Sequence, residues 1–331
     1  MPLSLQQLQA LQADAMADDV DIELDKMSLW TAAEATAYFE SGGAIEPPPP
    51  PPAFTAPFTR GTEATGTSPW LSCLEKKPDA AFRMVVFSWT GNRGGQGSAH
   101  NLRRAPLNWS QAAPAAEIYE ISLPGRGMRQ KEALVTDVNQ LADAIASSLS
   151  AALSRGKPYA FVGFSFGAVL AWEVALRINS LQPSEGPALL CAVSSEGPSW
   201  TGRRGTQHTL GEQKFIDMLR RKGGTDFILK DAGMTKMYVP VIKADLALEE
   251  TYTGANGRKV GVVTFAVVGT QPGRDKEKTK VQPEDAQLWL SDTSSPGSRL
   301  ILLDNVDWYV LQEETGARAV IQEVSTFMLN V

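Results

Sequence analysis

The sequence predicts an α/β fold in which a mostly parallel sheet is covered by helices on both faces. From about residue 80 onward, short apolar runs alternate with helical patterns. The chain has 331 residues, 43% of them hydrophobic and 21% charged, which is ordinary for a globular protein with a sizeable core. The alternation breaks once, at about 205–256, where the pattern is helical without a strand. We interpret that stretch as an inserted helical lid.

Six apolar runs are the predicted strands. They span residues 82–88, 116–122, 159–164, 188–194, 261–268 and 299–304. Helical patterns fall between them, notably at 135–154 and 167–178. Because ligands of such sheets bind beyond the carboxyl ends of the strands, the residues that follow each run are the candidates for a site.

The chain is divided into two parts by composition. Residues 1–70 are predicted to be an acidic leader with a proline-rich linker, and residues 71–331 to be the α/β domain. The first 60 residues hold nine acidic and two basic side chains, a net charge of −7 in a chain whose total is −6. The remainder therefore carries +1.

Two short helices are predicted in the leader. Leucines recur at helical spacing after Ser4, and Thr31 and Glu34 form a capping box ahead of a second helix. The run Pro47–Pro52 predicts a stiff polyproline II spacer. Residues 1–45 are either a loosely ordered tail or a helical docking element for another protein.

Several classes of protein are excluded by composition. No apolar run approaches the 18 or more residues of a membrane helix, and the first residues lack the features of a signal or transit peptide, so we expect a cytoplasmic protein. Cys73 and Cys191 are the only cysteines, which excludes a disulfide framework. No basic stripe with interleaved aromatics is present, which argues against nucleic-acid binding.

The segment Gly163-Phe164-Ser165-Phe166-Gly167 lies where a predicted strand meets a predicted helix. Glycines on both sides of a serine at such a junction are typical of a nucleophile elbow, a tight turn that projects the serine hydroxyl outward. The N–H of Phe166, at the start of the helix, would then stabilise an oxyanion. The alternative is a strand-to-helix turn without chemistry.

A second oxyanion donor is expected in the loop after the run at 82–88. That loop begins Ser88-Trp89-Thr90-Gly91 and is rich in glycine, which would let it fold closely over the site. The alternative is a flexible glycine loop of no consequence.

Beyond about residue 80 the chain resembles the thioesterases of the α/β-hydrolase fold, most of all the stand-alone type II thioesterases of polyketide and nonribosomal peptide synthesis. The resemblance rests on six segments: Val85–Gly91, Leu123-Pro124-Gly125-Arg126-Gly127 followed by Arg129 and Glu132, the serine pentapeptide, Leu219–Thr225, Ala244-Asp245 with Glu250-Thr251-Tyr252, and Val281–Asp285 with Trp289. It implies a Ser-His-Asp triad in which Ser165 is the nucleophile, with the N–H groups of Thr90 and Phe166 as the oxyanion hole.

The triad is incomplete in this sequence. Asp307 stands where the family has its histidine, in the stretch Asp304-Asn305-Val306-Asp307-Trp308-Tyr309. The position of the acid is occupied by Lys278, with Asp275 as a possible replacement and Glu196, after the preceding strand, as a distant one.

The chain has only two histidines, His100 beyond the glycine loop and His208 at the start of the lid. For both, a non-catalytic role is the favoured interpretation. An aspartate is a poor base for a hydroxyl, because its pKa lies near ~3.9 against ~6.5 for imidazole.

The resemblance implies a hydrolase that acts on acyl thioesters bound to coenzyme A or a carrier protein, without a cofactor of its own or a metal, and weakened by the loss of the histidine. The alternative is a non-catalytic scaffold or regulator that binds an acyl chain or a carrier protein. Carrier proteins are acidic, and basic residues gather in and just before the lid: Arg203, Arg204, Arg220, Arg221 and Lys222. These predict a docking surface for an acyl or peptidyl carrier protein.

Overall fold

The computed structural model describes residues 36, 38, 40, 68–88, 107–153, 157–181, 185–222, 225–271, 281–307 and 309–331. The chain divides into two compact units, Met1–Thr55 and Ala56–Val331. In the first unit Thr36, Tyr38 and Glu40 are helical, as expected of the helix that follows Thr31. The first predicted helix of the leader and the proline run lie outside the described residues.

The second unit is built on a seven-stranded sheet with the order β1-β3-β2-β4-β5-β6-β7. The strands are β1 (Leu71–Cys73), β2 (Phe82–Phe87), β3 (Ala116–Ile121), β4 (Tyr159–Phe164), β5 (Leu189–Val193), β6 (Val263–Gly269) and β7 (Arg299–Leu303). All neighbouring strands are parallel except β1, which is antiparallel to β3. The six predicted strands are confirmed within two residues at each end. β1 was not predicted, because three residues are too few to show a pattern.

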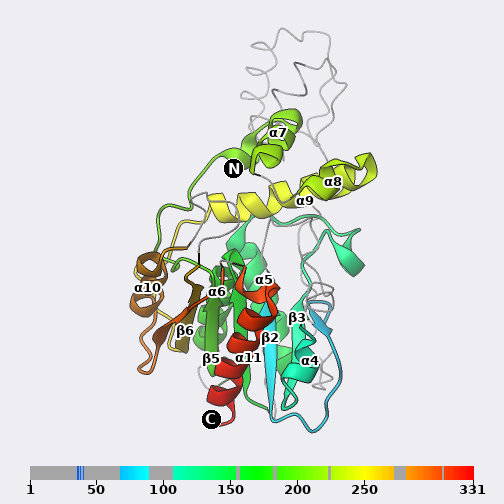
Figure 1. The fold of residues 1–331 in the computed structure, drawn as a ribbon. Coiled ribbons are helices and arrows are strands. Elements are labelled where there is room, and N and C mark those ends of the chain that lie inside the picture. The colour runs from blue at the N-terminus through cyan, green and yellow to red at the C-terminus, as the bar shows by residue number, and fades with distance from the viewer. Residues whose placement is uncertain are drawn as a thin grey trace. The chain divides into compact units, whose positions relative to one another are not determined.

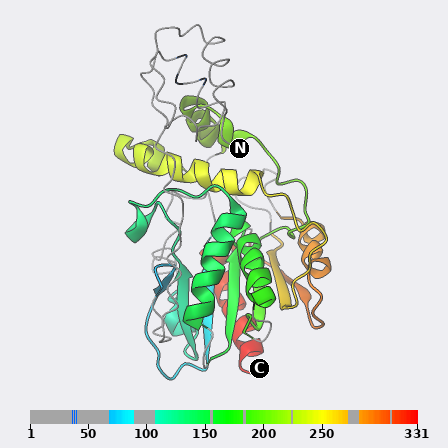
Figure 2. The ribbon, with the colours of Figure 1, turned by 180° about the vertical axis from the view of Figure 1, so that it is seen from behind.

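Helices cover both faces of this sheet, as predicted. Helices α5 (Val138–Leu153), α6 (Phe166–Leu181) and α10 (Pro283–Ser291) lie on one face, and α4 (Trp109–Ala112) and α11 (Glu314–Met328) lie on the other (Figures 1 and 2). Every residue of β3, β4 and β5 is buried. The strands read as continuous apolar runs because both of their faces are covered.

The predicted lid is confirmed as a helical insertion between β5 and β6. It contains α7 (Glu212–Lys222), α8 (Asp226–Leu229) and α9 (Ala232–Glu250). These helices share a small apolar core of their own, in which Phe215 and Ile228 are fully buried. The lid can therefore hold its shape through contacts within itself.

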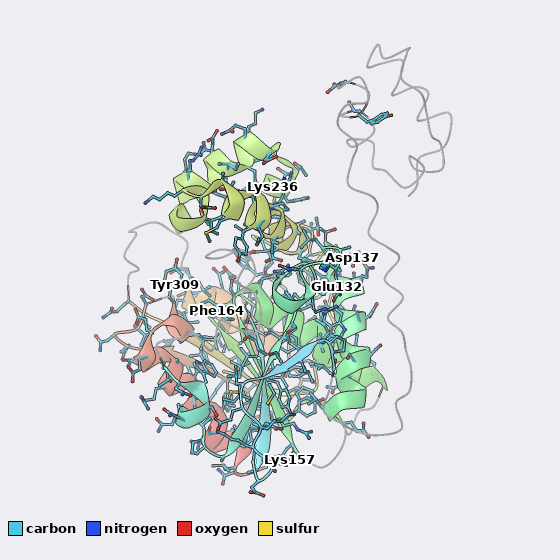
Figure 3. All side chains as sticks on the ribbon, turned by 90° about the vertical axis from the view of Figure 1, so that its right-hand side faces the viewer. Glu132, Asp137, Lys157, Phe164, Lys236 and Tyr309 are labelled. Atoms are coloured by element: carbon cyan, nitrogen blue, oxygen red, sulfur yellow. The ribbon has the colours of Figure 1, made fainter. Side chains whose placement is uncertain are left out.

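The lid lies over the carboxyl edge of the sheet. Figure 3 shows Lys157, just before β4, at one end of the domain, and Phe164, the last residue of β4, toward the lid, which carries Lys236. Tyr309, in the segment that follows β7, lies at the same end of the sheet as Phe164 and away from Lys157 (Figure 3).

The last residue of the predicted linker packs into the domain. Trp70 is buried, and the guanidinium carbon of Arg129 lies 3.9 Å from the centroid of its ring. The body of the domain thus begins slightly before β1. None of the described helices combines the length and the apolarity that crossing a membrane requires.

Candidate active site

Ser165 occupies a strained turn between β4 and α6. Its φ is 53°, a left-handed conformation that residues other than glycine adopt at a cost of about 1–3 kcal/mol. Its N–H donates to the carbonyl of Val193 at the end of β5 (2.9 Å), and its carbonyl accepts from the N–H of Ala168 (2.9 Å). The turn is therefore fixed on both sides, and Ser165 itself remains partly exposed.

The flanking glycines are required by packing. A Cβ atom on Gly163 would overlap the backbone of Ala168, with its nitrogen at 2.6 Å. A Cβ atom on Gly167 would lie 2.5 Å from the carbonyl oxygen of Phe87 and 2.6 Å from that of Ser88. The helix start thus presses against the end of β2, where the glycine-rich loop begins. The geometry is that of the predicted elbow.

Phe166 is the first residue of α6. The first N–H groups of a helix have no partner within the helix, so they can bind developing negative charge. Its ring is buried and meets the ring of Tyr252 edge to face, with centroids 5.9 Å apart. Thr90, the other predicted donor, lies outside the described residues, as does most of its loop.

The beginning of that loop contacts a buried carboxylate that sequence reasoning missed. The hydroxyl of Ser88 donates to Oε1 of Glu120 at 2.5 Å, and Glu120 has no exposed surface. Two glutamates, Glu117 and Glu120, within the apolar run of β3 were the available signal. Glu120 anchors the first residue of the glycine loop.

Asp307 lies in the turn that follows β7, the place predicted for the missing histidine. Its backbone packs against Gly269, where a Cβ atom would overlap the carbonyl oxygens of Val306 and Asp307. The backbone at Val306 and Asp307 thus packs against Gly269, the last residue of β6. Because β5 lies between β4 and β6, the axes of these two strands are about 10 Å apart.

The carboxylate of Asp307 has a local partner. Asp307 is buried, and its Oδ1 accepts the N–H of Tyr309 at 2.6 Å. An aspartate side chain is also shorter than the imidazole that it replaces. Both facts weaken its suitability as a base for Ser165.

Glu196, the distant candidate for the acid, follows β5, the strand next to β4. Burial raises the pKa of its carboxyl group, and Arg203, at 3.8 Å, opposes this only in part. A raised pKa makes Glu196 a better proton acceptor than an ordinary carboxylate. Asp275, the other candidate for the acid, lies outside the described residues.

His208 is held by the end of the lid. Its Nδ1 lies 2.7 Å from Oε2 of Glu250, and the same oxygen accepts the backbone N–H of His208 at 2.9 Å. The Glu250 side chain is buried. This pair ties the beginning of the lid to its last helix, in keeping with a non-catalytic role. His100 lies outside the described residues.

A buried ion pair joins the lid to the sheet. The guanidinium of Arg126, in the loop after β3, donates two hydrogen bonds of 2.7 Å to the two carboxylate oxygens of Asp245 on α9. The two side chains are only 3% and 2% exposed. The sequence showed both residues as parts of motifs, but their contact spans 119 positions and was not predicted.

A second buried carboxylate lies two turns beyond Ser165. Glu173 on α6 has no exposed surface, and it accepts hydrogen bonds from Arg177, Arg258 and the hydroxyl of Tyr252. Burial alone would raise the pKa of Glu173, but these three donors outweigh it and lower the pKa. The lone acidic residue in an apolar helix was the sequence signal for this cluster, which sequence reasoning missed.

The predicted basic docking surface needs one correction. Arg203 is buried and donates to the backbone carbonyls of Glu196, Gly197 and Trp200, so it is not available to a partner. Arg220 and Arg221 are exposed on α7. Within the described residues, histidine, cysteine and acidic side chains form no group of three or more that could hold a metal ion.

Solved structures share this fold. The thioesterase RedJ from the prodiginine pathway of Streptomyces coelicolor superposes with a TM-score of 0.60 at 25% identity, covering 75% of this chain and 90% of RedJ. BorB, a type II thioesterase from the borrelidin biosynthetic cluster, superposes with a TM-score of 0.62 at 25% identity, covering 77% and 97% of the two chains. The α/β-hydrolase fold predicted from the sequence is confirmed.

Sequence comparison assigns the family. Residues 104–315 match the family model for the thioesterase domain, so this chain belongs to the thioesterase domain family. A probable cadicidin biosynthesis thioesterase of Streptomyces griseus is 32% identical over 228 residues, which are 69% of this chain and 58% of that relative. The human medium-chain S-acyl fatty acid synthase thioesterase is 28% identical over 243 residues, 70% of this chain and 85% of that protein.

Proposed function

We propose that this protein hydrolyses acyl thioesters slowly, with Ser165 as the nucleophile. The observation that carries the proposal is the elbow, in which a partly exposed serine at φ 53° sits between two glycines at which a Cβ atom would overlap neighbouring backbone atoms. The acyl group arrives on the phosphopantetheine arm of a carrier protein or on coenzyme A, and the protein needs no cofactor of its own.

The reaction has two steps. The hydroxyl of Ser165 loses its proton to water or to a nearby carboxylate as its Oγ bonds to the thioester carbonyl carbon, and the N–H groups of Phe166 and Thr90 stabilise the oxyanion. Collapse of this intermediate breaks the carbon–sulfur bond and releases a thiolate. Water then attacks the acyl-serine and releases the free acid and the serine hydroxyl.

A thioester tolerates the loss of the histidine better than an amide does. A thiol has a pKa near ~8.5, so the leaving group departs as a thiolate and needs no general acid. The proton of Ser165 must still be removed, and the carboxylate at position 307 is a weak base engaged with Tyr309. Loss of a triad histidine lowers turnover by about 10⁶, whereas oxyanion stabilisation and binding retain roughly 10³–10⁴ over water. We therefore expect slow hydrolysis.

The test compares the protein with Ser165→Ala on short-chain acyl thioesters. We expect a low rate that Ser165→Ala abolishes, together with covalent labelling of Ser165 by a phosphonate probe, detected by peptide mass spectrometry. Turnover of many per second would show that an efficient base is present. Activity that survives Ser165→Ala would eliminate Ser165 as the nucleophile.

A second candidate function is binding without turnover. It is favoured by Asp307, which stands at the position that carries the base in a complete triad. Here the carboxylate of Asp307 accepts a hydrogen bond from the backbone N–H of Tyr309 in the same turn. In that case the protein holds an acyl chain or a carrier protein as a scaffold or regulator. Binding of an acylated carrier together with a Ser165 inert to the phosphonate would favour this function over hydrolysis.

The partner is proposed to be an acidic carrier protein that docks near the lid. Arg220 and Arg221 support this on α7, although Asp217 accepts a hydrogen bond of 2.8 Å from Arg220 and offsets part of its charge. Exposed charges are screened within ~10 Å at 0.1 M salt, so the association should weaken as salt is raised. Arg220→Glu combined with Arg221→Glu should weaken it further. An affinity independent of salt and of both changes would exclude this surface.

A further inference from the structure

Tyr252 lies where the lid rejoins the rest of the domain. Helix α9 ends at Glu250, and Tyr252 follows two residues later with its side chain buried. The lid begins close by, since the N–H of Gly205 donates to the carbonyl of Glu250 at 3.4 Å. The guanidinium carbon of Arg203, just before the lid, lies 6.0 Å from the centroid of the Tyr252 ring. The two chain segments that connect the lid therefore meet at Tyr252.

The ring of Tyr252 contacts the residue that follows Ser165. The rings of Tyr252 and Phe166 meet edge to face, with centroids 5.9 Å apart and planes at 75°, a geometry that aromatic pairs prefer. Phe166 is the first residue of α6, and helix α9 crosses above α6 in Figure 1. The ring of Phe166 and its backbone N–H are joined through one Cα atom. The contact with Tyr252 therefore also constrains the direction of that N–H.

The hydroxyl of Tyr252 holds the ring in place. It donates to Oε1 of Glu173 at 2.8 Å. Glu173 follows Phe166 by seven positions on α6, so both side chains lie on the same face of that helix. Burial, together with the negative charge of Glu173, raises the pKa of the Tyr252 hydroxyl, which stays protonated and remains a donor. Tyr252 thus contacts α6 at two points, two turns apart.

Glu173 is itself fixed by two arginines. Arg258 donates to its two carboxylate oxygens at 2.9 and 2.6 Å, and Arg177 donates to Oε2 at 2.5 Å. Replacing a buried ion pair by apolar side chains of similar volume is often neutral for stability or better. Stability alone therefore gives no reason for a charged cluster here. What the cluster provides is a fixed acceptor for the hydroxyl of Tyr252.

We propose that Tyr252 is a positioning residue, which holds the N–H of Phe166 where it can stabilise the oxyanion. The inference rests on the proposed function, in which Phe166 is one of the two oxyanion donors. Tyr252 belongs to the segment that leaves the lid, so the end of the lid and this donor are joined through one side chain. Hydrolysis is then efficient only while the end of the lid keeps the ring of Tyr252 against Phe166.

Kinetics of the full-length chain test the role of the ring. Tyr252→Leu removes both the ring and the hydroxyl, whereas Tyr252→Phe keeps the ring contact. For a short-chain acyl thioester, Tyr252→Leu should lower kcat by about 10–100-fold, because a misplacement of about 1 Å can cost 10²-fold. KM should change little, since KM equals the dissociation constant of the substrate when chemistry is slow. Tyr252→Phe should retain most of the rate, and labelling of Ser165 by the phosphonate should slow in the same order.

A control variant separates positioning from a general loss of stability. Phe265 on β6 is also buried and meets Phe327 edge to face, with centroids 5.5 Å apart, on the face of the sheet that α11 covers. Phe265→Leu removes an aromatic contact of the same kind and should lower the melting temperature. At a temperature where all variants are folded, it should leave kcat and the rate of labelling unchanged.

Hydrogen exchange tests the placement of the backbone without turnover. Amides of residues 166–170, at the start of α6, should exchange faster in Tyr252→Leu than in the native protein. Their exchange should stay close to native in Tyr252→Phe and in Phe265→Leu. Unchanged exchange in Tyr252→Leu would overturn the inference, as would an unchanged kcat in a protein whose hydrolysis depends on Ser165. If no hydrolysis depends on Ser165, the proposed function fails, and exchange alone decides whether Tyr252 holds the start of α6.

Discussion

Replacing Asp245 with alanine should destabilise the protein strongly, because it leaves the guanidinium of Arg126 buried without its counter-charge. In the native protein both side chains are at most 3% exposed and share two hydrogen bonds of 2.7 Å. What would remain is a hydrogen bond of 3.3 Å from Nε of Arg126 to the carbonyl of Pro124. Removing one partner of a buried pair costs about 3–5 kcal/mol. For a domain of this size each kcal/mol corresponds to roughly 2–4 °C, so the melting temperature should fall by roughly 6–20 °C.

The assay is urea unfolding followed by circular dichroism, applied to a double-mutant cycle. Arg126→Met with Asp245→Leu removes both charges and should cost less than either single change, since an apolar pair can replace a buried ion pair with little loss. The matched control is Arg220→Met, which breaks the exposed pair with Asp217 and should cost at most about 1 kcal/mol. A loss below about 1 kcal/mol for Asp245→Ala, or single losses that simply add in the double variant, would refute the view that this pair holds the lid to the sheet.

Three further predictions follow from the site and its surroundings. Gly167→Ala should destabilise the protein by about 1–3 kcal/mol and abolish labelling of Ser165 by the phosphonate probe. The reason is that the alanine Cβ would lie 2.5 Å from the carbonyl oxygen of Phe87. Thermal melts measure the loss of stability, and peptide mass spectrometry measures the labelling. Glu173→Gln should cost about 3–5 kcal/mol at neutral pH. The pKa of Glu173 is lowered in the folded protein, so its contribution to stability is present above the ordinary glutamate pKa near ~4.3 and is lost as the pH falls through the folded pKa. In Glu173→Gln the free energy of unfolding should therefore depend less on pH in this acidic range. Unfolding curves between neutral and acidic pH measure this dependence, and a variant that loses stability with falling pH as the native protein does would contradict the prediction. Asp307→His should raise thioester hydrolysis, by up to roughly 10²-fold, if a carboxylate can orient the new ring; loss of activity in Asp307→Asn would instead show that the aspartate is itself catalytic.

The sheet could be predicted because its strands are sequence-local patterns. Apolar runs of six to eight residues separated by helical periodicity leave few alternatives, and the observed strands of five to seven residues lie within two residues of them at each end. The elbow was predictable for a related reason, since a strand, a glycine-flanked serine and a helix are contiguous in the sequence. β1 escaped prediction because its pairing with β3, rather than its own three residues, makes it a strand.

The polar contacts around the site could not be predicted, since they join distant parts of the chain. Arg126 and Asp245 were visible as motif residues, but nothing in either motif shows that the other is its partner. Arg203 illustrates the opposite error. It was grouped with exposed arginines by position in the sequence, whereas burial and three backbone carbonyls define its role. Burial depends on the whole fold, so a charged residue near a lid cannot be assigned to its surface from spacing alone.

Backbone strain does not by itself identify the nucleophile. Two serines at the ends of adjacent strands adopt left-handed conformations, Ser165 after β4 with φ 53° and Ser194 after β5 with φ 49°. Ser194 is fully buried, and its Oγ has no hydrogen-bond partner among the described residues, so no substrate can reach it. Ser165 is partly exposed and is followed directly by the first N–H groups of a helix of 16 residues. Partial exposure and the N–H groups at the start of the following helix, rather than strain, therefore distinguish Ser165 as the proposed nucleophile, and both features are present although Asp307 stands at the position predicted for the histidine.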